Sequence, residues 1–265
     1  MVIKLAKKYF KIWLRFAING FQTQISVRFA LIIFLLGKIL RFGVYTFFII
    51  ILVGKTKVLA GYSLDQTIFF FLSFNLVDIL AQLLFREVYR FRQAVVSGNF
   101  DFYLIRPVNV LFRSLFGGPD VMDFITLFPL IFAIIFFMDK LNLINPVNIF
   151  IYIILISCAF LIALSFHILV LSLAVVTTEI DHAIMMYRDI VGMGRFPIDI
   201  YREPLRGFLT FVIPVGIMMS FPTKALLGLL NPYLIIYAVI FSIAIFYLSL
   251  RVWNWSLRSY SSASS

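Results

Sequence analysis

The chain has 265 residues, of which 63% are hydrophobic and only 13% are charged, whereas soluble domains hold about half apolar residues and about a quarter charged ones. A soluble core cannot absorb this excess, so the composition indicates one polytopic membrane domain over residues 1–265. The net charge of +11 does not indicate a nucleic-acid partner, because the cations flank apolar runs and form no basic patch with stacking aromatics. The only cysteine, Cys158, excludes an intrachain disulfide.

Residues 1–28 predict an amphipathic helix that lies in the membrane interface as an elbow before the first span. Its cations recur every three or four residues and therefore share one helical face, while Trp13 and other apolar residues line another. Such a helix sets its cations among anionic headgroups, so membrane lipids are expected partners. The alternative is a solvated basic tail. The predicted membrane-interface residues are Lys4, Lys7, Lys8, Lys11, Trp13 and Arg15.

Apolar runs of about 20 residues, long enough to cross ~30 Å of hydrocarbon, predict an all-α fold. About six transmembrane helices are expected within a bundle of residues 33–251. Near the start of the first span, Lys38 and Arg41 are expected to snorkel to the nearer headgroups. Five of the spans are expected at 33–53, 66–85, 120–138, 148–174 and 233–251.

The crossing that precedes the last span has two interpretations. In the first, the short segment 207–221 crosses or re-enters the membrane, and the charged segment 177–206 forms interfacial helices on the inner side. In the competing layout, residues 183–200 cross inside the bundle and residues 205–230 form a re-entrant hairpin on the outer side.

The distribution of cations predicts the orientation. If the N-terminus is cytoplasmic and the first interpretation holds, nineteen of the 23 Lys and Arg residues lie on the inner side. Cytoplasmic loops carry such an excess, so both termini and the tail 252–265 are expected in the cytoplasm, at a bacterial inner or plasma membrane. The four cations left outside are Lys55, Lys57, Lys140 and Lys224.

The inner loop 86–119 is too patterned to be a plain connector. A charged helix is expected to continue the second span to about Val96, to break at Ser97-Gly98-Asn99 and to restart until Pro107 stops it. We therefore predict a short helix across the inner face of the membrane; the alternative is a loop that merely joins two spans against lipid. The side chains it would offer are Phe100, Tyr103 and Leu104 with Asp101 and Arg106.

Catalytic chemistry has no support in the sequence. Gly54-Lys55-Thr56 resembles the end of a phosphate-binding loop, but Ile49 occupies the position of the required first glycine. His167 has no second ligand one turn away, so no metal site is predicted. Asn75 and Asp78 share one face of the second span and, with His167, are candidates for a translocation path. The alternative is that they make structural hydrogen bonds between helices.

Five stretches from residue 61 onward resemble, in order, signatures of the six-span permeases of the ABC-2-type transporter family. These stretches read GYSLDQTIFFF, VVSGNFDFYLIRPVNVLF, GRFPIDIY, VIPVGIMMSFPTKALLG and VWNWSLRSYSSAS. The resemblance implies a coupling helix that docks in a groove of an ATPase. Its residues would be Ser97, Gly98, Asn99, Phe100, Asp101, Tyr103, Leu104, Arg106 and Pro107.

The resemblance further implies a non-enzymatic export subunit with defined partners. It would pair with a second permease, as a homodimer or a homologous heterodimer, and with two separate ATPase subunits that bind ATP and Mg, leaving no cofactor in this chain. The alternative function is an ATP-independent secondary transporter or channel, for which internal repeats are typical. Residues 30–140 and 145–255 show no convincing repeat of each other.

Overall fold

A computed structural model describes residues 2–177 and 180–260. The elements of this part of the chain are helical, apart from one isolated β-bridge between Leu59 and Tyr62. The long helices are α1 (Val2–Ser26), α2 (Arg28–Thr56), α3 (Leu64–Phe85), α7 (Val121–Lys140), α8 (Pro146–Thr177) and α12 (Pro232–Arg258). The shorter elements are η1 (Arg86–Arg90), α4 (Phe91–Val96), α5 (Asn99–Ile105), α6 (Val110–Leu115), α9 (Ile180–Gly192), η2 (Met193–Arg195), η3 (Ile198–Ile200), α10 (Leu205–Gly207), η4 (Phe208–Val212), η5 (Gly216–Ser220) and α11 (Phe221–Leu226).

Among the described residues, five helices are long and apolar enough to cross a membrane: α2, α7, α8, α12 and the continuous segment Leu64–Val96, which starts with α3. Each matches one of the five predicted spans, with Asp120 of the span 120–138 as the N-cap of α7, so the predicted all-α polytopic fold is confirmed. The helices are longer than the spans because their polar ends extend beyond a hydrocarbon layer of ~30 Å. The predicted tail begins inside α12, and its polar end, residues 261–265, lies outside the described residues.

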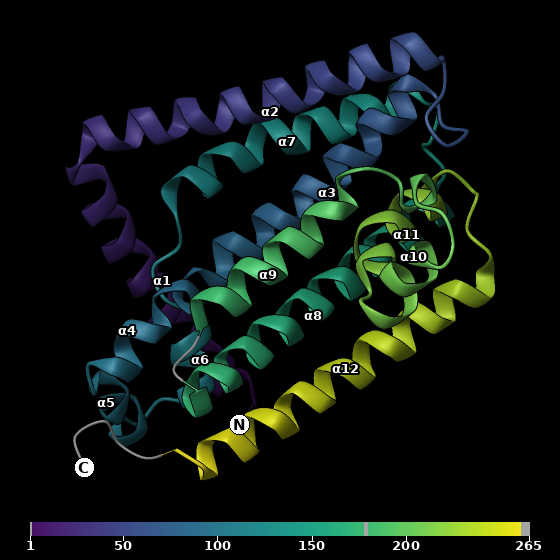
Figure 1. The fold of residues 1–265 in the computed structure, drawn as a ribbon. Coiled ribbons are helices and arrows are strands. Elements are labelled where there is room, and N and C mark those ends of the chain that lie inside the picture. The colour runs from purple at the N-terminus through teal and green to yellow at the C-terminus, as the bar shows by residue number, and fades with distance from the viewer. Residues whose placement is uncertain (1, 178–179, 261–265) are drawn as a thin grey trace.

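The spans form a bundle around α8 (Figure 1). Helix α12 packs along α8, and α3 packs against both α8 and α7. On α8, Ala159 and Ala163 are fully buried beside Leu155 and Ile162, since small side chains let membrane helices approach closely. Helix α2 lies on the outside, over α3 and α7. We call the end of the bundle that carries α5 the α5 end, and the opposite end, with the α2–α3 and α7–α8 loops, the far end.

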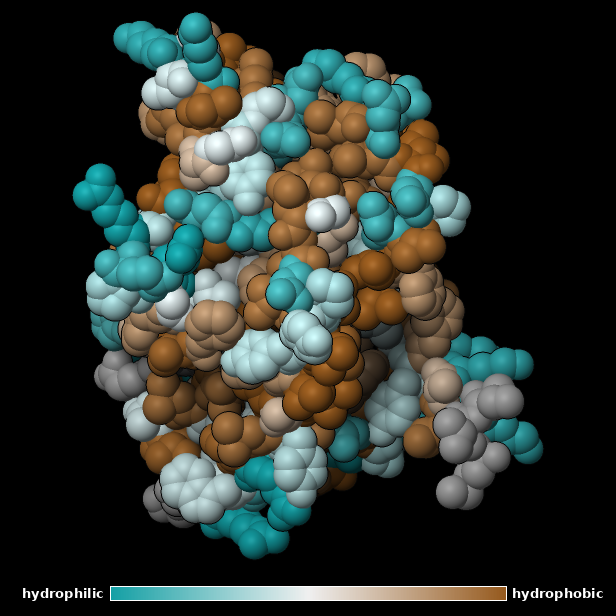
Figure 2. Space-filling view, turned by 90° about the vertical axis from the view of Figure 1, so that its right-hand side faces the viewer, coloured by the Kyte–Doolittle hydropathy of each residue, from teal (hydrophilic) through white to brown (hydrophobic). Residues whose placement is uncertain are grey.

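The surface of the bundle is apolar. Figure 2 shows apolar side chains over much of one face, with polar side chains gathered in separate patches. Large apolar residues stand exposed on several spans, such as Phe132 on α7 with 72% and Phe150 on α8 with 65% of its surface accessible. Water-soluble proteins rarely expose such continuous apolar areas, so lipid is the natural solvent of this surface.

The structure contradicts the interpretation of residues 177–206 as interfacial helices at the α5 end. Helix α9 starts after α8 at that end, but Phe196 packs its ring beside Phe48 in the last third of α2. Asp199 then accepts a hydrogen bond of 2.9 Å from Tyr62, in the far-end loop between α2 and α3. Burial, and next the Asp199 carboxylate, raise the pKa of this tyrosine. The segment therefore crosses the bundle, as in the competing layout with 183–200 as a span, and its charged residues Arg195 and Asp199 bond to Tyr45 of α2 and to Tyr62.

The predicted span 207–221 is a bent hairpin at the far end. Its two arms, Leu205–Val212 and Gly216–Leu226, meet at an angle of 83°, and Pro214 between them cannot donate a backbone hydrogen bond. Arg206 at the start and Lys224 at the end both approach the Asp199 carboxylate, at 4.0 and 2.7 Å. Because both ends of the hairpin meet the same carboxylate, it re-enters at one side and does not cross.

Helix α1 turns away from α2 at Val27 and runs over the α5 end (Figure 1). The Tyr9 hydroxyl accepts a hydrogen bond from the Asn109 backbone, and Gln24 bonds to the backbone at Pro119 and Val121. The predicted cationic face is present: its five cations line one shallow surface with Ile12. Trp13 is half-buried on the packed side, so it contributes to the fold as well as to the apolar side of the helix. The five cations of the cationic face of α1 are Lys4, Lys7, Lys8, Lys11 and Arg15.

The close approach of α1 to the linker before α7 gives a first prediction. A Cβ on Gly20 would lie 2.9 Å from the Gly118 Cα, a backbone atom that cannot rotate away. Gly20→Ala should therefore lower the free energy of unfolding by about 1–3 kcal/mol, measured by thermal unfolding in detergent. Gly37→Ala in α2 is the matched control, because beyond its chain neighbours and the adjacent helix backbone nothing lies within 4 Å of its Cβ position, and it should be neutral or slightly stabilising. Equal melting of the two variants would contradict this packing.

Candidate functional site

Helix α5 is fixed to the bundle by one buried aromatic side chain. Phe100 has no accessible surface, and its ring packs edge-on against Phe91 of α4 at 5.1 Å and Tyr260, beyond α12, at 5.0 Å between centroids. Such aromatic pairs contribute about 0.5–1.5 kcal/mol each beyond the burial of area. Before α5, Gly98 takes a left-handed conformation with φ of 73°, which glycine adopts without strain. The predicted break and short helix are thus present, with α5 held between α4 and the end of α12.

The exposed edge of α5 differs from the predicted one. Phe100 and Tyr103 are three residues apart and share the inward face, so Phe100 is not offered to a partner. Leu104 is exposed as predicted, and Phe102 and Ile105 are exposed beside it, Ile105 with 78% of its surface accessible. Sequence reasoning placed the helix but selected the wrong aromatic residue, because helical spacing alone does not show which face meets the bundle.

Polar contacts fix the same helix from both sides. The Tyr260 hydroxyl donates to Asp101 at 3.0 Å, and the Arg113 guanidinium lies 4.6 Å from the centre of the Tyr103 ring. Arg113 in turn pairs with Glu87 at 2.9 Å. Burial raises the pKa of Tyr103, although the Arg113 charge acts in the opposite direction. Its hydroxyl therefore stays protonated at neutral pH, and α5 gains no anion there. The remaining predicted coupling residues, Ser97, Asn99, Arg106 and Pro107, are exposed around it.

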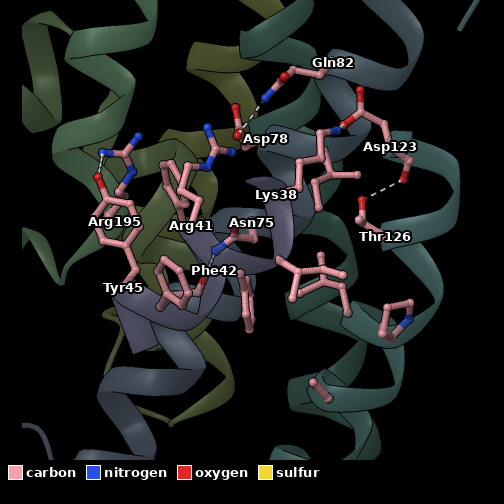
Figure 3. A pocket seen from close by; sticks show the side chains of 17 residues that line it. Lys38, Arg41, Phe42, Tyr45, Asn75, Asp78, Gln82, Asp123, Thr126 and Arg195 are labelled. Atoms are coloured by element: carbon pink, nitrogen blue, oxygen red, sulfur yellow. Dashed lines mark hydrogen bonds and ion pairs between the residues drawn. The ribbon is translucent and has the colours of Figure 1, made fainter. Parts of the chain in front are cut away.

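A cavity of about 280 Å³ lies between α2, α3 and α7 (Figure 3). Its polar side chains come from all three helices and from Arg195 of η2. Asn75 and Asp78, two of the predicted translocation residues, line it. A neighbouring cavity of about 220 Å³ shares Arg41, Asp78 and Arg195 and adds residues of α9. The main cavity is lined by Lys38, Ile39, Arg41, Phe42, Tyr45, Phe71, Phe74, Asn75, Asp78, Ile79, Gln82, Asp123, Thr126, Pro129, Leu130, Ala133 and Arg195.

Most polar groups of the main cavity have partners within the chain. Lys38 forms an ion pair with the buried Asp123 at the start of α7. Asp78 accepts a hydrogen bond of 2.8 Å from Gln82, one turn further along α3. Arg195 donates to the Tyr45 hydroxyl at 2.8 Å and stacks over its ring. The first of these contacts holds α2 to α7 and the third holds η2 to α2, while the Asp78–Gln82 bond lies within α3.

His167 lies away from this cavity. It is buried between the rings of Phe85 and Tyr187, and its Nδ1 lies 2.8 Å from the Ala163 carbonyl oxygen. The third predicted translocation residue thus does not join Asn75 and Asp78. Sequence reasoning did not assign Lys38, Arg41, Asp123 or Arg195 to a binding site, although charged residues within separate apolar spans are the signal that could have grouped them.

Comparison with known families agrees with this architecture. The sequence-family model that describes ABC-2 family transporter proteins matches residues 39–264. The chain therefore belongs to the ABC-2 transporter family as a membrane subunit. Searches of curated proteins and of solved structures returned no match.

The Lys38–Asp123 pair gives a second prediction. Lys38→Met leaves the Asp123 carboxylate buried without its cation, which should cost about 3 kcal/mol of unfolding free energy. The double variant Lys38→Met/Asp123→Leu should recover most of that loss, because it removes both charges and leaves no unpaired carboxylate in the bundle. In the control, Lys140→Met breaks the more exposed pair with Asp65 and should cost less than about 1 kcal/mol. Equal losses in the single and double variants, measured by thermal unfolding, would contradict a stabilising pair.

Proposed function

We propose that this chain is the permease subunit of an ATP-binding cassette exporter of the ABC-2 type, and that α5 is the helix through which a separate ATPase drives it. The observation that carries the proposal is the design of α5. Phe102, Leu104 and Ile105 are exposed on a seven-residue helix that Phe100 anchors to the bundle. Exposed apolar residues on an anchored helix suit insertion into a groove of a partner protein.

The proposed orientation sets α5 in the cytoplasm, where an ATPase would reach it. Six Lys and Arg residues lie at the far end, Arg202 and Arg206 among them. Fifteen lie at the α5 end when Lys38 and Arg41 are counted there, and Arg188 and Arg195 lie between the two ends. An excess of cations in short loops marks the cytoplasmic side. Both termini are then cytoplasmic, and the cationic face of α1 lies among the headgroups of the inner leaflet.

The path from α5 into the membrane is short and rigid. Phe100 meets Phe91 of α4, and α4 continues α3 through η1 within one segment, Leu64–Val96. Tyr260 links the same phenylalanine to the end of α12. A push on α5 would therefore move α3 and α12 together, as expected where packed helices transmit a rigid-body change. The proposed step is that closure of the ATPase dimer delivers this push and turns the pathway between two permeases outward.

The proposed transporter consists of two permeases and two ATPase subunits. Two ATPase subunits bind ATP and Mg, and each docks on one permease. The second permease is an identical chain or a homologue, and this chain contributes half of the translocation pathway. Catalysis of ATP hydrolysis lies in the partner, so the permease itself works as a mechanical and binding component in the cell membrane.

Ile105→Glu tests the docking surface. A carboxylate at the most exposed apolar position of α5 should lower co-purification of the ATPase and ATP-driven transport by at least about tenfold, as for the loss of an interface hot spot. The ATPase is identified by mass spectrometry from its own nucleotide-binding loop.

The matched control is Ile144→Glu, the same substitution at a 63% exposed isoleucine in the far-end loop. It should leave the complex intact. Should the Ile105→Glu permease retain the ATPase and transport as well as the Ile144→Glu permease does, α5 is not the docking helix.

A further inference from the structure

The main cavity carries more polar side chains toward the α5 end, and its wall on α7 is apolar toward the far end. The polar side chains Lys38, Gln82 and Asp123 lie toward the α5 end of their helices. The apolar lining continues from there toward the far end (Figure 3). This arrangement matches an amphipathic molecule in one leaflet, with its headgroup toward the α5 end and its chain toward the middle of the membrane. The apolar lining includes Phe71, Pro129, Leu130 and Ala133.

Three cations line this cavity: Lys38 pairs with Asp123, and Arg195 bonds to Tyr45. For the third, Arg41, the described residues provide neither a hydrogen bond nor an ion pair. It lies in the first half of α2, the half nearer the α5 end, and α2 is an apolar helix of 29 residues. An arginine in hydrocarbon costs about 3 kcal/mol or more, so such residues face a partner or an aqueous cavity. Figure 3 shows the Arg41 guanidinium pointing into the cavity, toward the side where Asp78 lies.

The charges around Arg41 are not balanced within the two neighbouring cavities. Four cations, Lys38, Arg41, Arg188 and Arg195, face three carboxylates, Asp78, Asp123 and Asp189. Lys38 neutralises Asp123. An added anion would bring the group to neutrality and supply the charge-assisted hydrogen bonds that a guanidinium forms with phosphate or carboxylate.

The cavity also opens to the surface of α2. Ile39 and Arg41 both line it and are both exposed, so a molecule can enter sideways from the lipid. A volume of about 280 Å³ is at the small end of ligand pockets. It suits a headgroup and the start of one chain, while the rest of the molecule stays among the lipids beside α2.

We propose that this cavity binds an anionic amphiphile, with its phosphate or carboxylate on Arg41 and its apolar chain against Phe71 and the middle of α7. The binding itself does not require the ATPase. Whether the amphiphile is transported cargo or a resident membrane lipid rests on the proposed function, and a second arm of the test separates the two.

Binding is measured on the full-length permease in detergent by native mass spectrometry, with dimyristoyl phosphatidylglycerol as the anionic probe and dimyristoyl phosphatidylcholine as the zwitterionic one. Arg41→Gln should weaken phosphatidylglycerol binding by about tenfold, as expected for loss of a charged hydrogen bond. Arg251→Gln is the matched control, because Arg251 is also an exposed arginine within a span, α12, outside the cavity. It should bind as the wild type does.

Asp78→Asn gives a change of opposite sign that misfolding cannot mimic. Removal of the carboxylate beside Arg41 should strengthen phosphatidylglycerol binding by several-fold, since less anionic charge then opposes the probe. Equal binding of the two lipids by the wild type, or equal phosphatidylglycerol binding by the Arg41→Gln and Arg251→Gln variants, would overturn the proposal. The latter result is also the one expected if a carboxylate of another protein occupies Arg41.

The second arm adds phosphatidylglycerol to the permease–ATPase complex. Stimulation of ATP hydrolysis that Arg41→Gln abolishes identifies the amphiphile as cargo-like, while specific binding without stimulation identifies it as a resident lipid. Both results support the site. Absence of any ATPase complex would count against the proposed function and leave the binding measurements as the test of the site.

Discussion

The packing of Phe100 joins α5 to the membrane-spanning helices, and the proposed coupling depends on this contact. Its ring sits without accessible surface against Phe91 and Tyr260, so α5 cannot shift without moving α4 or the end of α12. A helix of seven residues has no stability of its own in water. Tertiary packing therefore makes α5 a rigid element, and rigidity is what the transmission of a push requires.

One helical segment connects the cavity with α5. Asn75 and Asp78 line the cavity from α3, and the same segment, Leu64–Val96, leads through η1 and α4 to the turn at Gly98. A displacement of α5 would thus reach the polar end of the cavity directly. The Lys38–Asp123 pair and the Arg195–Tyr45 bond join α3's neighbours around that end, so a change in α3 would alter the surroundings of Arg41.

Much of the architecture could be predicted from the sequence because length and polarity decide it. Long, mainly apolar runs predicted five spans, and the break at Ser97-Gly98-Asn99 located α5. The path of residues 177–206 could not be decided, since charged residues avoid lipid equally by lying at an interface or by pairing inside a bundle. Here Asp199 pairs with Lys224 and Arg195 bonds to Tyr45, more than 20 residues away in each case. The direction of Phe100 and the grouping of charges from three spans depend on such distant contacts and are invisible to local spacing.

The proposed coupling requires that α5 faces the cytoplasm, and cysteine accessibility tests this orientation most directly. In a chain whose only natural cysteine, Cys158, is replaced by alanine, a Phe102→Cys variant is treated with a membrane-impermeant maleimide. Labelling in inside-out vesicles but not in intact cells is predicted, with the reverse for an Ile144→Cys variant in the far-end loop. Labelling of the Phe102→Cys variant in intact cells would set α5 outside, where no ATP-driven partner could reach it, and would contradict the proposed coupling.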